Sequence, residues 1–493
     1  MPSEGRPEFG HFSTTAAVEN SSTTPGTRSG SAWRWAAVLI PGLILYFVPL
    51  TSLNAGQRHL LAFFVSTIIS LIVQPIAMGA SILTAMTALV LTETLPAAVV
   101  LAGFADPTVW LIFTAFLFSR AVTDTGLGAR VAYLFIRRFG QSALRLGYSL
   151  AFSDLVLAPF VPSDTARGGG IISPITRSVA GALGSEPGTP SGRTGGFLVL
   201  VAFHTTYVAS AMFLTGMAAN PLMADFGLKI AHVEMNWIRW FAGAIVPGSI
   251  SILLVPLLLY RIHRPSITDT RPARDHARAE LKHMGPLSTR ERRLGVIMLL
   301  VMCGWITSPW HHIPNAFVAL AGVSAILITR VLVWDDLLGE RKAWDALIWF
   351  APLIMMAGEL NKRGVIQTLS QSMFQFSRLL PWLLALLFLV ASYLYIHYGF
   401  ASMTAQITAL YPAFLFAALA SGAPPLLAAL MLAYFSNLNA GLTHYGTGSA
   451  PVYFGLGYVS QATWWRIGFL ISILSLVIWA GIGMLWWRAI GYW

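Results

Sequence analysis

Long apolar runs recur along the chain from residue 33 to its end, and polar or glycine-rich segments separate them. Roughly 20 apolar residues form an α-helix long enough to cross about 30 Å of hydrocarbon. Eleven runs approach this length, at residues 33–50, 59–74, 76–91, 107–118, 197–222, 241–260, 294–306, 316–333, 343–360, 426–443 and 465–487. The pattern therefore predicts an all-α polytopic membrane protein with about eleven transmembrane helices.

Two further apolar stretches, residues 144–183 and 380–420, are each interrupted by a short polar tip. We expect each stretch to enter the membrane and return as a re-entrant hairpin. Unwound backbone at membrane depth is tolerated only where protein or a water-filled cavity satisfies its polar groups. The two hairpins therefore predict a cavity at their tips.

The composition supports a membrane protein. Of the 493 residues, 56% are hydrophobic and only 10% are charged, against roughly 25% charged residues in a soluble domain. The net charge of +11 comes from basic residues that cluster beside the apolar runs and in residues 263–293. Because Lys and Arg accumulate in cytoplasmic loops, we interpret this charge as topology and expect no nucleic-acid partner. It predicts a bacterial inner-membrane protein with a cytoplasmic N-terminus and a periplasmic C-terminus.

The chain divides into four segments. Residues 1–31 are rich in Ser, Thr and Gly without an apolar core, which predicts a disordered N-terminal tail. Residues 32–262 form a first repeat, 263–293 a cytoplasmic basic loop, and 294–493 a second repeat.

The repeats are recognised by matching polar and glycine positions. The segments VTDTGLGARVAYLF and ELNKRGVIQTLSQSM each leave an apolar run through a glycine, Gly126 or Gly364, and the following hairpin tips read PSDTA and ASMTA. Ser163 and Ser402 in these tips are 239 residues apart, while the two glycines are 238 apart. The first half enters the membrane from outside and the second from inside, so we expect inverted repeats, as in many secondary transporters.

A second pair of breaks follows the hairpins. The apolar run after each hairpin is interrupted by a cluster of small residues, GMAANP from Gly216 and GTGSAP from Gly446. Each hairpin tip begins a new helix at Ser-X-Thr, where a hydroxyl can cap the exposed amides of a terminus that carries about half a positive charge. Two such termini meeting from opposite leaflets would each take one carboxylate of an anion. The predicted substrate-binding residues are Ser163, Asp164, Thr165, Arg167, Ser402, Met403, Thr404, Gly216, Asn437, Gly446 and Thr447.

Several segments carry a family resemblance. GLGARVA, APFVPSDTARGGGIISPI, YGFASMTAQITALYP, SNLNAGLTHYGTGSAPVYFGLGYV and the terminal WWRIGF together resemble the divalent anion:sodium symporter family, in its citrate/succinate and 2-oxoglutarate/malate translocator branch. The resemblance covers nearly the whole chain after residue 33. It implies a homodimer of elevator-type carriers for di- or tricarboxylates, in which a Ser-Asn-Thr tip of each hairpin contacts a substrate carboxylate and helps to form sodium sites.

The tips depart from that pattern, because Asp164 and Met403 stand where the family has asparagine. Met403 lacks the side-chain oxygen, which favours exchange or another coupling ion. An ionised Asp164 at mid-membrane costs about 2.5–3.5 kcal/mol, so it must be paired, protonated or cation-bound. Arg167 lies within helical reach of Asp164. Either it pairs with Asp164, or its guanidinium binds a substrate carboxylate. Three roles for Asp164 follow as alternatives. It is a helix N-cap neutralised by Arg167, a proton or cation ligand that sets the coupling of transport, or a determinant of substrate choice.

We expect a secondary active transporter of succinate, malate, 2-oxoglutarate or citrate, working by exchange, with no cofactor and with Na⁺ or H⁺ as the candidate coupling ion at Asp164. The alternative within this class is a proton- or sodium-coupled symporter of sulfate or an aromatic carboxylate. A membrane channel is the alternative outside it. An enzyme would need an acid–base pair or clustered metal ligands within the bilayer, and the sequence presents no such spacing.

Overall fold

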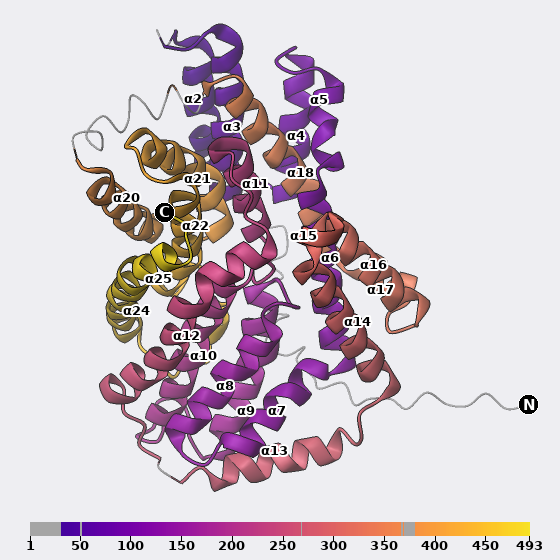
Figure 1. Cartoon of the computed structure of the whole chain (residues 1–493), viewed down its shortest axis with the longest axis vertical. Coiled ribbons are helices and arrows are strands. Elements are labelled where there is room, and N and C mark those ends of the chain that lie inside the picture. Colours follow the sequence, from indigo (N-terminus) through magenta and orange to yellow (C-terminus); the bar gives the residue numbers. More distant parts are fainter. Residues whose placement is uncertain (1–30, 50–51, 268, 366–367, 369–379) are drawn as a thin grey trace, which may run out of the picture.

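The computed structural model describes residues 31–49, 52–267, 269–365, 368 and 380–493, and every regular element within those ranges is a helix (Figure 1). The fold-class prediction of an all-α protein is therefore confirmed. Of the predicted disordered tail, residues 1–30 lie outside the described residues. The first described helix begins at Ser31.

The first half contains α2 to α12. Their bounds are α2 (Ser31–Phe47), α3 (Ala55–Val73), α4 (Met78–Leu91), α5 (Ala97–Ala102), α6 (Pro107–Thr125), α7 (Leu127–Phe139), α8 (Ala143–Leu157), the π-helical η3 (Thr165–Ile172), α9 (Ser173–Ala182), α10 (Gly192–Met212), α11 (Asn220–Ala231) and α12 (Trp237–Ile262), with a 3₁₀ turn η2 (Gly103–Ala105).

The second half contains α14 to α25, after the linking helix α13 (Arg271–His283). Its elements are α14 (Thr289–Ile306), α15 (Ser308–His311), α16 (Asn315–Ile328), α17 (Trp334–Gly339), α18 (Arg341–Lys362), α20 (Trp382–Ile396), η5 (His397–Gly399), α21 (Met403–Ala420), α22 (Pro425–Leu438), η6 (Asn439–Gly441), α23 (Ala450–Phe454), α24 (Gln461–Ser475), the π-helical η7 (Leu476–Ile482) and α25 (Gly483–Ala489).

The helices make this chain a multi-pass membrane protein. Seven described helices are long and apolar enough to cross a membrane, and an eighth span results if the bent pair Ala97–Ala105 and Pro107–Thr125 counts as one. Shorter apolar helices cover three more of the predicted runs, at α2, α4 and α16. Two of the seven, Trp382–Gly399 and Met403–Ala420, are the limbs of the second predicted hairpin, so helix length and composition alone do not confirm the expected eleven spans.

Helices end at the predicted breaks and at the predicted hairpin tips. Residues 213–219 separate α10 from α11, and residues 439–449 separate α22 from α23. The first hairpin consists of α8 and the η3–α9 limb, joined by residues 158–164, and the second consists of α20 and α21, joined by residues 397–402. Gly126 (φ +78°) and Gly364 (φ +73°) both adopt the left-handed conformation after a long helix, which glycine adopts without a Cβ clash.

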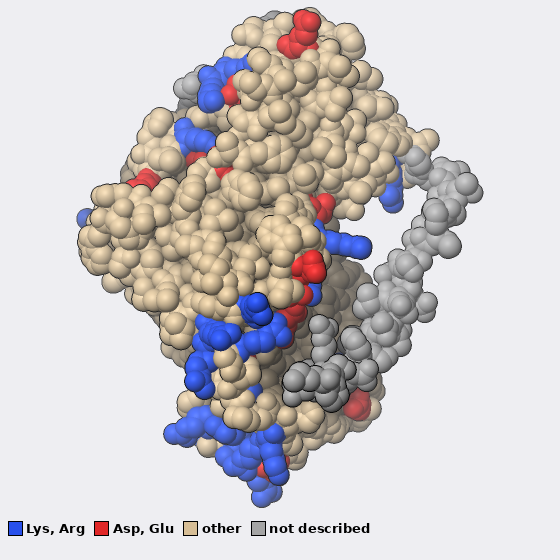
Figure 2. Space-filling view, turned by 90° about the vertical axis from the view of Figure 1, so that its right-hand side faces the viewer, with Lys and Arg blue, Asp and Glu red and all other residues tan. Residues whose placement is uncertain are grey.

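The basic segment between the halves differs from the expected loop because it contains the 13-residue helix α13. This helix lies across the lower end of the molecule, beneath α7, α8 and α9 (Figure 1). Its Ala273 and Ala277 are fully buried, and its charged residues occupy the other faces. Lys and Arg side chains gather at this same end of the molecule (Figure 2). These two alanines form a short apolar stripe, which allows an otherwise polar segment to pack as a helix against the bundle.

Candidate functional site

Each hairpin tip carries a serine that caps the limb returning from it. The hydroxyl oxygen of Ser163 accepts a hydrogen bond from the amide of Ala166 at 3.2 Å, and that of Ser402 accepts one from the amide of Ala405 at 3.3 Å. The two serines occupy matching positions, and each satisfies an amide that the helix start leaves without a backbone partner. The capping predicted from Ser-X-Thr is confirmed for both serines.

Asp164 connects the first hairpin to the break in the second half. Its side chain is 6% exposed, and its Oδ2 accepts hydrogen bonds from the hydroxyls of Thr447 and Ser449. It makes no capping bond to the limb that follows it. The N-cap interpretation of Asp164 is therefore wrong. Its carboxylate accepts hydrogen bonds from hydroxyls of the opposite repeat instead of from the backbone amides of its own limb.

Thr165 and Gly448 extend this contact between the first hairpin and the second break. A Cβ atom at Gly448 would overlap Thr165 Oγ1, so glycine allows the backbone of the second break to lie this close to the Thr165 side chain. In the second hairpin, Met403 is 5% exposed while Thr404 is partly exposed. The asymmetry follows from the central tip residues, since aspartate needs polar partners and methionine packs against apolar ones.

Arg167 is fully buried and bonds to protein groups through all five of its N–H donors. Its Nε donates to Asp154 Oδ1 at 2.9 Å, within an ion pair in which both side chains are 0% exposed. The expected pairing with Asp164 is thus wrong, and since a guanidinium has five N–H groups, none is left for a substrate carboxylate. The remaining acceptors are the carbonyl oxygens of Val161, Gly216 and Thr206 and the hydroxyl of Ser210, at 2.7–3.0 Å.

His397 is a buried imidazole at the turn of the second hairpin. Its Nε2 lies 2.8 Å from the carbonyl oxygen of Gly446, and its Nδ1 is hydrogen-bonded to Gln406 Oε1. The Gln406 amide nitrogen donates to the carbonyl of Tyr393, and Gln406 Oε1 also accepts from Asn439. These bonds fix the orientation of the amide, so both ring nitrogens of His397 face oxygen acceptors. An imidazole donates from both nitrogens only when it is protonated.

The two hairpins carry related chemistry at matching positions. In each half, a buried side-chain nitrogen is hydrogen-bonded to the carbonyl of the glycine that opens the small-residue cluster, Arg167 to Gly216 and His397 to Gly446. The spacing of 239 residues that separates the capping serines also relates Asp154 to Tyr393 and Arg167 to Gln406. In the first half Arg167 itself bonds to the glycine carbonyl, and in the second Gln406 bonds to His397, which contacts the glycine carbonyl.

The helices that border the two breaks, α11 and α22, contact each other through a pair of buried amides. Asn437 donates to Asn220 Oδ1 at 2.9 Å, and Asn220 in turn donates to the carbonyls of Ser210 and Phe213. Asn437, predicted to line a cavity, is 0% exposed at this contact. Three nearby buried oxygens, Asn437 Oδ1, Asn439 Oδ1 and Thr443 Oγ1, have no hydrogen-bond partner in the described part of the chain.

Sequence reasoning missed Asp154, His397, Gln406, Ser449 and Gly448. A signal was present for the first two, because each is an ionisable residue inside an apolar hairpin limb, and such residues are functional candidates by default in a membrane. Gln406, Ser449 and Gly448 offered no comparable signal, since their roles depend on which element packs against them.

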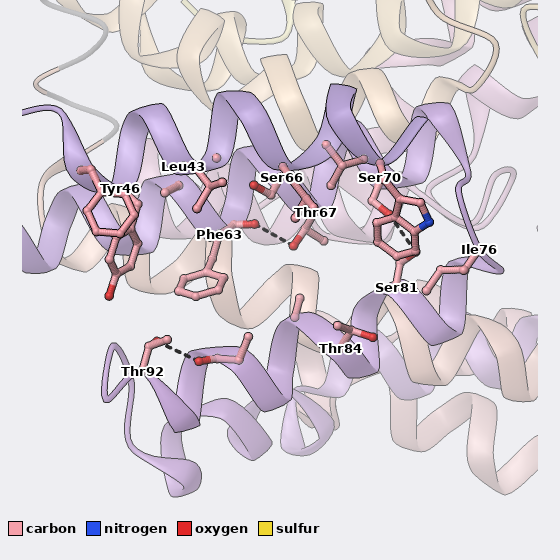
Figure 3. Close-up of a pocket in the computed structure, with 18 residues that line it drawn as sticks. Leu43, Tyr46, Phe63, Ser66, Thr67, Ser70, Ile76, Ser81, Thr84 and Thr92 are labelled. Carbon is pink, nitrogen blue, oxygen red and sulfur yellow. Dashed lines mark hydrogen bonds between the residues drawn. The ribbon is translucent and has the colours of Figure 1, made fainter. Parts of the chain in front are cut away.

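A cavity of about 490 Å³ lies elsewhere, between α2, α3 and α4 (Figure 3). Apolar and hydroxyl side chains line it, including Tyr46, Phe63, Ser70 and Thr84, and none of its lining residues is charged. It contains none of the predicted site residues. Its chemistry does not suit a dicarboxylate.

Comparison with known proteins identifies the family. Residues 29–493 match the family described as the sodium:sulfate symporter transmembrane region. The chain belongs to this family, the divalent anion:sodium symporters. The predicted resemblance is thereby confirmed.

Individual relatives of this symporter-family chain bear transporter names. Dicarboxylate transporter 1 from the chloroplast of Arabidopsis thaliana is 44% identical over 493 residues, covering 98% of this chain and 88% of the relative. The spinach protein of the same name is 45% identical, covering 93% and 81%. The Bacillus subtilis protein YflS, provisionally named a malate transporter, is 46% identical, covering 92% and 95%.

Solved structures show the fold of this symporter-family chain at lower identity. MtrF of Neisseria gonorrhoeae matches with a TM-score of 0.58 and 13% identity, covering 91% of this chain and 97% of MtrF. The YdaH transporter of Alcanivorax borkumensis matches with a TM-score of 0.54 and 17% identity, covering 94% and 98%. These likenesses support a membrane-transporter architecture for the chain.

Proposed function

We propose that this protein exchanges small dicarboxylates across a membrane by alternating access, and that succinate, malate or 2-oxoglutarate is the substrate. The names of relatives at 44–46% identity support the substrate class. The observation that carries the exchange proposal is that both ring nitrogens of His397 contact oxygen acceptors, an arrangement that we propose holds it as a fixed cation. The substrate is translocated unchanged, so no catalytic residue is proposed.

The proposed substrate lies between the two hairpin tips. The limbs that begin after Ser163 and Ser402 start with capped helix termini, whose partial positive charge favours carboxylates. Thr165 and Thr404, both partly exposed, offer hydroxyl donors beside these termini. Two termini separated by the width of the site suit an anion with two carboxylates, one for each hairpin.

A fixed cation favours exchange over sodium symport. A sodium ion leaves the carrier together with its substrate, whereas the charge of His397 stays. Asp154 neutralises Arg167, but no carboxylate is hydrogen-bonded to His397 among the described residues. Moving an uncompensated charge through the bilayer centre costs on the order of 2.5–3.5 kcal/mol. The return step is therefore faster when a second dicarboxylate balances that charge.

Ion-coupled symport is the second candidate, and one specific observation favours it. The three unpartnered oxygens of Asn437, Asn439 and Thr443 are ligands of the kind that hard cations prefer. Asp164 is the coupling-ion candidate at the first hairpin, where it would bind a proton or a cation together with Thr447 and Ser449. The family description, which names sodium and sulfate, makes sulfate the competing substrate.

The proposed assembly is a homodimer of elevator-type carriers in the bacterial inner membrane. We propose a cytoplasmic N-terminus and a periplasmic C-terminus, because the basic residues gather at the end of the molecule where α13 lies (Figure 2) and such residues favour the cytoplasmic side. Accessibility labelling of single cysteines at positions 283 and 488, after replacement of Cys303, tests this orientation.

The deciding experiment measures uptake of labelled malate, succinate, 2-oxoglutarate and sulfate into proteoliposomes. Uptake that requires internal dicarboxylate supports exchange. Uptake into empty vesicles driven by a sodium or proton gradient overturns exchange in favour of symport, and loss of that drive in Asp164→Asn assigns the coupling site. Sulfate transport without dicarboxylate transport overturns the substrate class.

A further inference from the structure

A crevice far along α8 from the hairpin tip combines two arginines with an apolar floor. It is a cavity of about 440 Å³, and Arg138, Arg145, Tyr148, Phe152 and Leu253 contribute to its lining. These residues come from the end of α7, the first turns of α8 and the middle of α12. It shares no residue with the proposed dicarboxylate site.

The two arginines form a cationic mouth. Both are exposed, and no carboxylate lies within ion-pair distance of either among the described residues. Arg145 donates to the neutral side-chain amide of Gln141 at 2.7 Å. The guanidinium carbon of Arg138 lies 5.5 Å from the centroid of the Phe139 ring. Two guanidinium groups without an acidic partner provide the planar donors that phosphate groups bind well.

The crevice becomes apolar with distance from this mouth. Phe152 lies seven residues beyond Arg145 on α8, which corresponds to about 10 Å along a helix. Tyr148 donates to the carbonyl of Leu253 at 2.6 Å and so fixes α8 against α12. Leu253 is 50% exposed, and its neighbour Leu254 and Val156 on α8 are 38% and 45% exposed. The floor therefore opens onto the hydrocarbon side of the bundle.

We propose that this crevice binds one anionic phospholipid, with the phosphate between Arg138 and Arg145 and an acyl chain against Phe152 and Leu253. Basic pockets between transmembrane helices near the cytoplasmic surface bind anionic lipid head groups, and the order of charge and apolar surface along α8 follows that of the lipid. A free phosphate ion would use the mouth and leave the apolar floor exposed. Because α7 and α8 meet here, the bound lipid contacts both α7, which precedes the first hairpin, and α8, which is the first limb of that hairpin.

The test measures lipid binding to the purified full-length protein in neutral detergent, independently of transport. Native mass spectrometry and the thermal unfolding midpoint are recorded with phosphatidylglycerol, phosphatidylcholine or inorganic phosphate. We expect phosphatidylglycerol to bind and to raise the midpoint more than the other two. The double variant Arg138→Gln/Arg145→Gln should bind it about tenfold or more weakly, since each basic residue near an anionic lipid contributes several-fold in affinity.

Two controls make the outcome decisive. Arg137→Gln/Arg292→Gln removes the same charge at exposed positions outside the crevice and should retain binding. Leu253→Ser should weaken phosphatidylglycerol binding while leaving any binding of inorganic phosphate unchanged. Equal loss in both double variants would reduce the effect to general surface charge, and equal binding of phosphate and phosphatidylglycerol would make the crevice a soluble-anion site. Either result overturns the proposal and leaves the dicarboxylate site untouched.

Discussion

The imidazole Nε2 of His397 lies 2.8 Å from the carbonyl oxygen of Gly446. This contact joins the turn of the second hairpin to the glycine that opens the second small-residue cluster. A Cβ atom on Gly446 would lie 2.9 Å from the same nitrogen. The position therefore favours glycine, whose carbonyl oxygen contacts His397. The relationship places the proposed fixed cation, His397, against the second break.

Replacing this cation tests its role directly. We expect His397→Gln to lower the rate of dicarboxylate exchange at least tenfold, because a hydrogen bond involving a charged group contributes about 1.5–3 kcal/mol. The measurement is counterflow in proteoliposomes. His283→Gln, an exposed histidine change on α13, should leave exchange unaltered. Undiminished exchange in His397→Gln would remove the cation from the proposal.

The hairpin-tip hydroxyls are predicted to bind substrate. Thr165→Ala and Thr404→Ala should each raise the concentration of dicarboxylate needed for half-maximal uptake, by roughly fivefold to tenfold for a neutral donor, without lowering the unfolding midpoint. Thr84→Ala, whose hydroxyl donates to Ala80 in a distant helix, is the matched control. Unchanged uptake in both tip variants would end the assignment of the tips.

The bond between Asp164 and Thr447 predicts energetic coupling between the repeats. Thr447→Val removes the hydroxyl donor, and Asp164→Asn keeps an oxygen acceptor while removing the charge. We expect a double-mutant cycle on the free energy of unfolding, measured by denaturing-detergent titration, to give a coupling of about 0.5–3 kcal/mol. The same cycle between Thr447 and the remote Asp275 should be additive. Additivity in both cycles would contradict a direct contact.

The close approach of Thr165 to Gly448 predicts a steric effect on transport. Gly448→Ala should reduce exchange strongly, since the added Cβ overlaps Thr165 Oγ1 and forces the hairpin tip to move. Gly170→Ala offers the matched control in the same hairpin, because a Cβ there meets nothing within 4 Å. Transport rates per folded protein decide the matter, and equal rates in the two variants would show that the tip tolerates the shift.

The buried pair of Asp154 and Arg167 is predicted to stabilise the first hairpin. Arg167→Gln should cost about 3–5 kcal/mol, because removing one partner leaves the other charge buried and uncompensated. Asp154→Asn/Arg167→Gln should recover part of that loss, since the pair is then neutral. Unfolding midpoints of the purified variants provide the measurement. A double variant less stable than the sum of its single changes would contradict the ion pair as the cause.

Local demands of the membrane made much of the architecture readable from the sequence. Apolar runs, hairpins and glycine breaks were predictable because each segment in hydrocarbon must satisfy its own backbone groups. Gly126 and Gly364 signalled the match between the halves, and both adopt the left-handed conformation that the turn requires. The capping serines followed from the same local rule.

The partners of the buried charges were decided only by the tertiary structure. Asp164 finds its donors 283 and 285 residues away, and local spacing carries no information about such pairs. Arg167 was expected to pair with Asp164 on an α-helical limb, but the limb begins as a π-helix, whose wider turn changes which residues share a face. Arg167 instead crosses the hairpin to Asp154, since burial makes the most fully hydrogen-bonded arrangement the favoured one.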